Sequence, residues 1–103
     1  MIRIGVDYGG TKIEAAALDA AGRFLSRVRT PNPRGYESSI EAIAGLVAQA
    51  EAEAGGRAEQ IGVGIPGSVS PRTGLIRNAN STWLNGRTFG ADLEARLARP
   101  VRL

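Results

Sequence analysis

The sequence predicts an α/β fold with the element order β-β-β-α-β-α-β and a mixed sheet. Three short segments joined by tight turns open the chain, as in an antiparallel meander. The spacing of apolar residues then changes to the period of an amphipathic helix over residues 36–53. A short apolar strand, a second helical pattern and the opening of one more strand follow. Strands that alternate with helices in this way indicate an α/β sheet.

The first three strands are predicted from alternation and from turn residues. Residues 1–7 (MIRIGVD) alternate apolar and polar side chains and end on an acid, which favours a strand that leads into a turn. Residues 12–18 (KIEAAAL) fit a second strand, although their alanines would equally suit a helix. Residues 24–29 (FLSRVR) resume as a third strand after another turn. The segment 31–33 (PNP) then ends the sheet, because proline cannot donate a hydrogen bond to a strand ladder.

The later elements are predicted from periodicity. The first helix, residues 36–53, carries an apolar stripe made of Ile40, Ile43, Ala44 and Val47. We expect Ser38 or Ser39 to cap its start and Gly55-Gly56 to stop it. Residues 60–65 form a short strand. A second helix is marked by apolar residues spaced by four, namely Phe89, Leu93 and Leu97.

The length of 103 residues corresponds to about one domain. Residues 101–103 look like the opening of one more strand, and natural domains seldom end at such a point. We therefore expect residues 1–103 to be the N-terminal lobe of a two-lobed protein whose C-terminal lobe is absent from this sequence.

Composition limits the class of protein further. The chain has 43% hydrophobic and 22% charged residues, which is ordinary for a soluble globular protein. No apolar run approaches the roughly 20 residues of a membrane span, and the first residues lack the pattern of a signal peptide. The absence of cysteine excludes disulfides and thiolate metal sites in this stretch. We expect a cytoplasmic protein with no membrane partner.

The net charge of +3 does not indicate a nucleic-acid partner. Lys12 is the only lysine among 13 basic residues, and the arginines are scattered along the chain. Nucleic-acid-binding proteins usually concentrate basic residues on one face and interleave aromatic residues that stack on bases. Aromatic residues make up 5% here and do not interleave with the arginines. The basic positions are best explained as a solvated surface.

The turn between the first two strands carries the clearest chemical pattern, Asp7-Tyr8-Gly9-Gly10-Thr11-Lys12. Two glycines accept positive φ and let main-chain N–H groups approach an anion without a Cβ in the way. Successive N–H groups that face one concavity hold phosphate oxygens. Thr11 adds a hydroxyl and Lys12 adds a mobile positive charge. Asp7, at the end of the strand, can hold Mg²⁺ through water.

Two better-known phosphate loops do not fit this turn. The pattern Gly-x-x-x-x-Gly-Lys-Ser/Thr is absent, and the dinucleotide fingerprint needs a helix where a strand is predicted here. On spacing alone an ordinary hairpin turn explains the pattern equally well, since Asp and Gly-Gly are common in such turns. The added Thr11-Lys12 pair and the three-strand context favour phosphate binding.

Three motifs in register extend this pattern over the whole chain: Asp7–Lys12, Gly62–Gly67 (GVGIPG), and Asn78–Asn80 followed by Trp83. With them the chain resembles the ROK family, which holds bacterial sugar kinases and sugar-sensing repressors on the actin-like, hexokinase-type fold. Among members it most resembles bacterial N-acetylglucosamine kinases and fructokinases. The resemblance implies the N-terminal lobe of an actin-like ATPase (ribonuclease H-like) fold.

The resemblance also implies roles for individual residues. The family's first phosphate motif, which serves ATP and Mg²⁺, matches Gly5, Val6, Asp7, Tyr8, Gly9, Gly10, Thr11 and Lys12. Gly67 and Ser68 match positions that contact sugar hydroxyls, and Asn80 matches a further sugar-binding position. An amide suits a hydroxyl because it both donates and accepts, although without the family match Asn78 and Asn80 would be read as turn formers. Trp83 either stacks on a sugar or anchors its loop in the core.

The activity implied for the complete protein is ATP-dependent phosphorylation of a hydroxyl of a hexose or N-acetylhexosamine. The family's general base is an Asp in an Asn-Asp-Ala motif after the strand that begins at Val101. No catalytic residue is therefore expected before Leu103, and we expect the isolated 103 residues not to turn over ATP. The adenosine-binding half and a His/Cys zinc motif lie further on in the family. Dimers are common among its members.

Two other functions are compatible with parts of this pattern. A sugar-sensing ROK-type regulator would carry a helix-turn-helix segment ahead of the phosphate motif. Here the motif strand starts at Met1, so the kinase is favoured if Met1 is the native start. A non-catalytic actin-like activator ATPase is disfavoured, because the segments Pro66–Ser68 and Asn78–Asn80 indicate a sugar pocket.

Overall fold

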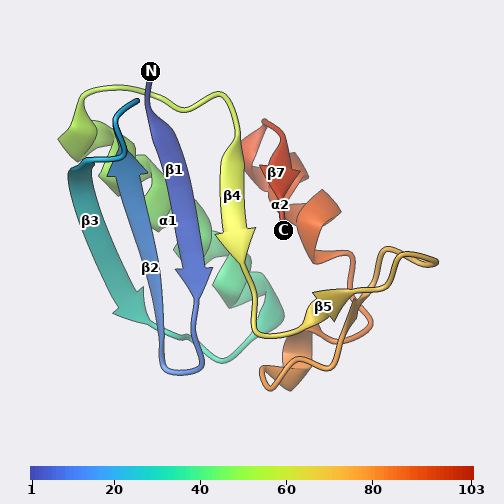
Figure 1. The fold of residues 1–103 in the computed structure, drawn as a ribbon. Helices are drawn as coiled ribbons and strands as arrows, with labels where there is room; N and C mark the ends of the chain where they lie inside the picture. The colour runs from blue at the N-terminus through green and yellow to red at the C-terminus, as the bar shows by residue number, and fades with distance from the viewer.

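The computed structural model describes residues 1–103 as a mixed sheet with two α-helices (Figure 1). The elements are β1 (Arg3–Tyr8), β2 (Lys12–Leu18), β3 (Phe24–Pro31), α1 (Tyr36–Ala54), β4 (Ile61–Gly64), β5 (Ser68–Val69), β6 (Ile76–Arg77), the 3-10 helix η1 (Thr82–Leu84), α2 (Phe89–Leu97) and β7 (Val101–Arg102). The main sheet has five strands in the order β3-β2-β1-β4-β7. The pairs β3–β2 and β2–β1 are antiparallel, whereas β1–β4 and β4–β7 are parallel. The predicted mixed α/β sheet is confirmed, and the short hairpin β5–β6 is an addition to it.

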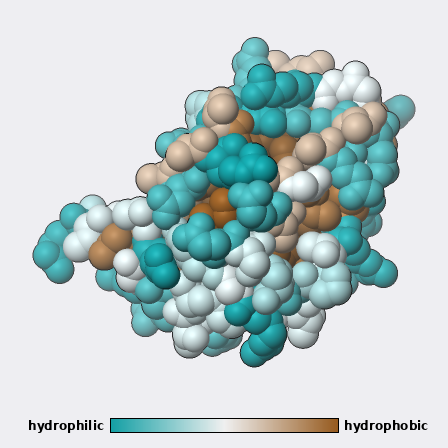
Figure 2. All heavy atoms as spheres, turned by 180° about the vertical axis from the view of Figure 1, so that it is seen from behind, coloured by the Kyte–Doolittle hydropathy of each residue, from teal (hydrophilic) through white to brown (hydrophobic).

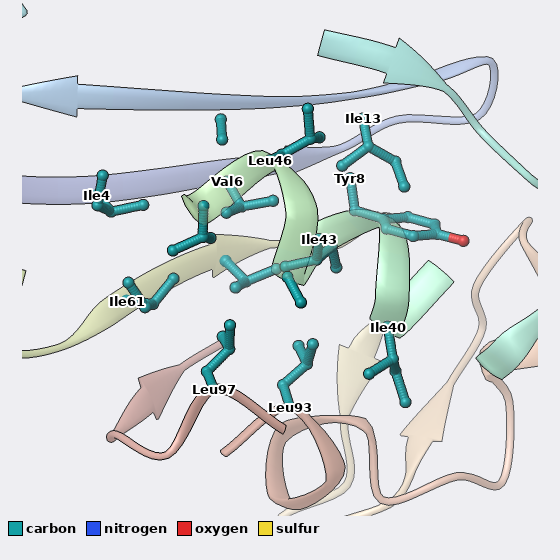
Figure 3. Close-up of a cluster of buried hydrophobic side chains, with 14 of the residues drawn as sticks. Ile4, Val6, Tyr8, Ile13, Ile40, Ile43, Leu46, Ile61, Leu93 and Leu97 are labelled. Carbon is teal, nitrogen blue, oxygen red and sulfur yellow. The ribbon is translucent and has the colours of Figure 1, made fainter. Parts of the chain in front are cut away.

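The core lies between one face of the sheet and the two helices. Alternate residues of β1 and β2 turn toward this face, as the period of a strand requires; they are the buried Ile4, Val6, Tyr8, Ile13, Ala15 and Ala17. α1 lays its apolar stripe against them, and α2 adds Leu93 and Leu97 (Figure 3). One cluster of 23 buried hydrophobic residues joins all these elements, so sheet and helices form a single folded unit.

The opposite face of the sheet, which Figure 1 views, carries no helix. Its central residue Gly5 is flanked by Ala16 of β2 and by Gly62 of β4. The next outward residue of β1, Asp7, is flanked by Glu14 and by another glycine. A floor of such small residues lets a ligand or a further segment of protein approach main-chain atoms.

The hairpin β5–β6 projects from the body of the molecule as an arm (Figures 1 and 2). Figure 2 views the helix side, where hydrophobic residues show as small patches between hydrophilic ones. Neither helix combines the length and the apolar character that crossing a membrane requires. The arm and the loops after it extend from the edge of the sheet at which β4 ends (Figure 1).

The two ends of α1 differ in how well they follow the prediction. Gly55 stops the helix as expected, with a φ of 81° and an N–H that donates to the Glu51 carbonyl. The prediction that Ser38 or Ser39 caps the start is wrong, because Gly35 is the N-cap residue and no side chain caps it. The hydroxyl of Ser39 instead donates to the Gly35 carbonyl from inside the first turn.

One ion pair ties the ends of the two helices together. Arg99, after α2, donates to both carboxylate oxygens of Glu51 at 2.6 and 2.9 Å and to the Ala58 carbonyl at 2.8 Å. Both charged side chains are only 11% exposed. Burial alone would raise the pKa of Glu51, but hydrogen bonds from Arg99 and from the Ala58 N–H hold this pKa below its ordinary value of 4.5.

Candidate functional site

The candidate site lies at the edge of the sheet where the parallel strands β1 and β4 end (Figure 1). Ligands of open α/β sheets bind beyond the carboxyl ends of such strands. The β1–β2 turn and the segment that follows β4 both start from this edge. The fold therefore brings together the two regions in which the sequence predicts phosphate and sugar contacts.

The two glycines of the β1–β2 turn are needed for different reasons. Gly9 donates its N–H to the Lys12 carbonyl at 2.9 Å, and a Cβ at Gly9 would lie 2.7 Å from that oxygen, so no side chain fits. A Cβ at Gly10 would meet nothing within 4 Å, so Gly10 leaves the tip of the turn open. Neither residue is among the glycines with positive φ. The prediction that this glycine pair adopts positive φ is therefore wrong, and the approach of its N–H groups to an anion stays a prediction.

The tip of the turn presents polar groups that the chain itself does not use. The side chains of Thr11 and Lys12 are exposed. None of the three ion pairs of the chain involves Lys12. Anions are typically bound by groups of this kind: a hydroxyl, an ammonium group and main-chain N–H groups that no side chain covers, as at Gly10.

Asp7 faces a shallow hollow of about 370 Å³ on the bare face of the sheet. The rest of it is lined by Glu14, Ala16, Gly5, Val6, Gly62 and Gly64. Arg27 pairs with Glu14 at 3.1 Å, whereas Asp7 takes part in none of the ion pairs. No group of three or more His, Cys, Asp or Glu side chains gathers to hold a metal ion. One free carboxylate fits a Mg²⁺ ion that keeps several waters and is shared with substrate phosphates, and it does not fit a cage built by the protein alone.

A larger hollow, about 780 Å³, lies at the opposite end of the strands, among Ile2, Arg57 and Pro100. None of the residues predicted to bind phosphate or sugar lines it. The chemistry of the side chains, and not the size of the hollow, locates the candidate site.

Asn32, in the loop between β3 and α1, holds the β1–β2 turn in place. Its side-chain Nδ2 donates to the Gly9 carbonyl at 2.9 Å, and its main-chain N–H donates to the Thr11 carbonyl at 2.8 Å. Its Oδ1 accepts from the Arg34 N–H at 2.8 Å. The sequence indicated a loop here but did not single out this residue. The available signal was an asparagine between two prolines directly after a strand, which is typical of a local side-chain turn.

Gly67 packs directly against the loop that carries Asn78 and Asn80. A Cβ at Gly67 would lie 2.5 Å from the Arg77 carbonyl oxygen and 2.9 Å from the Ala79 nitrogen. The structure thus brings two of the predicted sugar-binding regions into main-chain contact. Ser68 pairs with Arg77 across β5–β6, and its hydroxyl accepts from the Arg77 guanidinium at 3.3 Å.

Asn80 is exposed at the surface of this loop. The loop is shaped by two other asparagines. Asn78 has a φ of 58°, the turn-forming conformation. Asn85 holds Ala79 from both sides, accepting from its N–H at 2.9 Å and donating to its carbonyl at 3.2 Å. Sequence reasoning missed Asn85, which fixes the residue before Asn80.

Trp83 anchors the same loop to the end of β1. Its indole Nε1 donates to the phenol oxygen of Tyr8 at 2.7 Å. The guanidinium of Arg34 lies 5.6 Å from the centre of the indole ring, within the range of a cation–π contact. Of the two roles that the sequence left open for Trp83, this structure has the anchoring role.

Residues 3–103 match the model of the ROK family. The chain belongs to the ROK family, as its three motifs predicted. Its solved structural neighbours also confirm the predicted actin-like fold.

Individual relatives are sugar kinases. An N-acetyl-D-glucosamine kinase from Shigella boydii is 39% identical over 100 residues, which cover 96% of this chain and 33% of the relative. The crystal structure of the ROK hexokinase from Thermus thermophilus shares 40% identity with a TM-score of 0.85, over 100% of this chain and 34% of that one. A ROK family glucokinase from Streptomyces griseus, solved with glucose and AMPPNP, shares 32% identity with a TM-score of 0.88, over 100% of this chain and 32% of that one. The chain thus spans about a third of the length of these relatives.

Proposed function

We propose that residues 1–103 form the N-terminal lobe of a two-lobed, ATP-dependent sugar kinase that phosphorylates a hydroxyl of a hexose or an N-acetylhexosamine. The observation that carries the proposal is the common sheet edge from which the turn Asp7–Lys12 and the segment containing Gly67 and Asn80 both extend. The names of the relatives support a sugar as the substrate. The shared third of their length supports a single lobe.

In this proposal the β1–β2 turn holds the phosphates of ATP. The N–H groups around Gly10, the Thr11 hydroxyl and the Lys12 ammonium group donate to phosphate oxygens. Asp7 would hold Mg²⁺ through water, and the ion would supply positive charge against the phosphates. The lack of a side chain at Gly10 leaves the backbone there open to the phosphates, whereas the space beside Gly9 is filled by the Lys12 carbonyl.

The sugar lies, in this proposal, against Gly67, Ser68 and Asn80. The exposed amide of Asn80 offers one donor and one acceptor to vicinal hydroxyls. Gly67 lets the start of β5 pack against the loop that carries Asn80, because the Arg77 carbonyl and the Ala79 nitrogen occupy the place of a Cβ. Asn85 and Trp83 keep the loop in place, which lowers the entropic cost of ordering it around a ligand.

The proton acceptor of the reaction lies beyond Leu103 in this proposal. The transfer is in line: the bond from the γ-phosphorus to the leaving oxygen of ADP breaks, the bond to the sugar oxygen forms, and the hydroxyl proton passes to the base. Within this chain Glu14 is paired with Arg27, and Asp7 is assigned to the metal. The 103 residues alone therefore bind and orient but do not catalyse. A coupled assay on this chain should show no sugar-dependent release of ADP.

Isothermal titration of the complete protein with glucose, fructose, mannose and N-acetylglucosamine tests the substrate class. A coupled assay of ADP release then uses the sugars that bind. Asn80→Ala should weaken sugar binding about tenfold, because a hydrogen-bonding amide is lost. Asn78→Gly is the matched control, since glycine accepts the φ of 58° and should leave binding near the wild-type value. Wild-type protein that binds none of the four sugars and releases no ADP would contradict the proposal, and a sugar-sensing regulator would bind sugar without releasing ADP.

A further inference from the structure

The phenol oxygen of Tyr8 joins the two predicted ligand regions. Tyr8 is the last residue of β1, directly before the two glycines, and its side chain is 2% exposed. Figure 3 shows its oxygen pointing out of the apolar cluster. That oxygen accepts from Trp83 Nε1 at 2.7 Å and lies 2.6 Å from the hydroxyl of Ser39 in α1.

The donors of this network have a defined direction. The Ser39 hydroxyl donates its hydrogen to the Gly35 carbonyl, so the hydrogen between Tyr8 and Ser39 comes from the phenol. The phenol oxygen is then free to accept from Trp83. The hydrogen bonds thus run from Trp83 through Tyr8 and Ser39 to the residue before α1.

Asn32 connects the same phenol to the tip of the turn. The phenol shares its one hydrogen between Ser39 at 2.6 Å and, as a longer and weaker branch, the Oδ1 of Asn32 at 3.4 Å. The Nδ2 of Asn32 donates to the Gly9 carbonyl at 2.9 Å. Asn32 is 7% exposed and Ser39 is fully buried. A buried network whose members are all hydrogen-bonded has few alternative arrangements, so a shift at one end is transmitted to the other.

We propose that Tyr8 is a positioning residue that couples nucleotide binding to sugar binding. The inference rests on the proposed function and adds a link between its two sites. A phosphate held on the turn acts on Tyr8 and Asn32, and Tyr8 acts on Trp83, which lies three residues after Asn80. Because such coupling is reciprocal, each ligand tightens the other by the same factor. Couplings of this kind are typically about 5- to 150-fold, and we expect about fivefold or more here.

The test measures the dissociation constant of the sugar in the complete protein, with and without AMPPNP, by isothermal titration. Tyr8→Phe removes only the phenol oxygen and should bring the coupling factor to about one to two, with smaller changes in the affinity for each ligand alone. Trp83→Phe removes the donor of the same hydrogen bond and should have the same effect. If Tyr8→Phe fails to fold, the coupling factor is measured in Trp83→Phe instead.

Tyr36→Phe is the matched control. The Tyr36 ring packs 5.9 Å from the Phe89 ring, centre to centre, as the Tyr8 ring does. Its phenol is also hydrogen-bonded, but to Asp92 of α2 and not to the Asn32 and Trp83 network. This substitution should lower stability while the coupling factor stays at the wild-type value. A purely structural role for Tyr8 would leave the two variants alike.

NMR spectroscopy reports directly on the hydrogen bond between the Trp83 indole N–H and the Tyr8 oxygen. Trp83 is the only tryptophan of this chain, and its indole N–H resonance is assigned by its loss in Trp83→Phe. That resonance should shift in Tyr8→Phe and when AMPPNP binds the wild-type protein, and it should stay in place in Tyr36→Phe.

The outcomes separate the two proposals. Sugar and AMPPNP binding with no coupling in the wild-type protein, or with equal coupling in wild type and Tyr8→Phe, would overturn the role of Tyr8 and leave the kinase proposal standing. Binding of neither ligand by the wild-type protein would overturn the kinase proposal and the coupling with it.

Discussion

The substitution Gly9→Ala tests why glycine is required at this position of the β1–β2 turn. The added methyl group would lie 2.7 Å from the Lys12 carbonyl oxygen, about 0.7 Å short of the 3.4 Å at which ordinary contact begins. That oxygen cannot simply move away, because it also accepts the hydrogen bond from the Gly9 N–H at 2.9 Å. The turn must therefore open and weaken this bond.

The expected cost follows from these two effects. Inserting a methyl group into a close-packed site costs about 1–3 kcal/mol, and a weakened main-chain hydrogen bond costs about 1 kcal/mol more. We expect Gly9→Ala to lower the free energy of unfolding by about 2–4 kcal/mol. For a chain of this length the melting temperature should fall by roughly 10–30 °C.

Gly10→Ala is the control, because it adds the same atom one residue later in the same turn. Its Cβ would meet nothing within 4 Å, and its φ is not in the left-handed region. We expect its free energy of unfolding to stay within about 0.5 kcal/mol of wild type. Thermal and urea denaturation of the 103-residue chain, followed by circular dichroism, measure both variants. Equal stability of the two variants would refute the steric argument for Gly9.

Three further predictions concern the hydrogen bonds and the ionisable groups around the site and the core. Asn32→Ala leaves the Gly9 carbonyl without its side-chain donor and should cost about 2 kcal/mol in urea denaturation; a variant as stable as wild type would contradict the clamp. Because the pKa of Glu51 is lower in the folded chain than its ordinary value of 4.5, stability should be present above pH 4.5 and be lost as pH falls further; Glu51→Gln should flatten this part of the pH profile. Burial and the Asp92 carboxylate raise the pKa of Tyr36 well above its ordinary 10.0, so stability should fall as pH rises above 10, where only the unfolded chain ionises. Tyr36→Phe should remove that fall, and an unchanged alkaline profile would count against the assignment.

Elements long enough to repeat their hydrophobic pattern could be predicted from the sequence, whereas the hairpin β5–β6 could not. The apolar stripe of α1 and the alternation in β1 identify these elements because buried positions recur at the period of a helix or of a strand. The strands of the β5–β6 hairpin have two residues each, too few to show any period. The hairpin is also held by the close contact of Gly67 with the main chain of Arg77 and Ala79, which exists only in the folded chain.

The polar groups of the candidate site could be named from the sequence, whereas the hydrogen bonds that hold them in place could not. The turn residues stand together in the sequence, so their polar groups could be recognised without the fold. Asn32 and Asn85 act through main-chain atoms that only the folded loops bring near. The wrong reason given for Gly9 has the same origin, since positive φ and steric closeness both favour glycine and only the coordinates distinguish them.

The clamp from Asn32 has a consequence for protein engineering. At the tip of the turn it touches only main-chain oxygens, those of Gly9 and Thr11. The shape of the turn and the identity of its exposed side chains are therefore controlled by separate residues. Thr11 and Lys12 can each be replaced by another residue while the hydrogen bonds that hold the turn remain in place, and under the proposed function such replacements would change the affinity for phosphate.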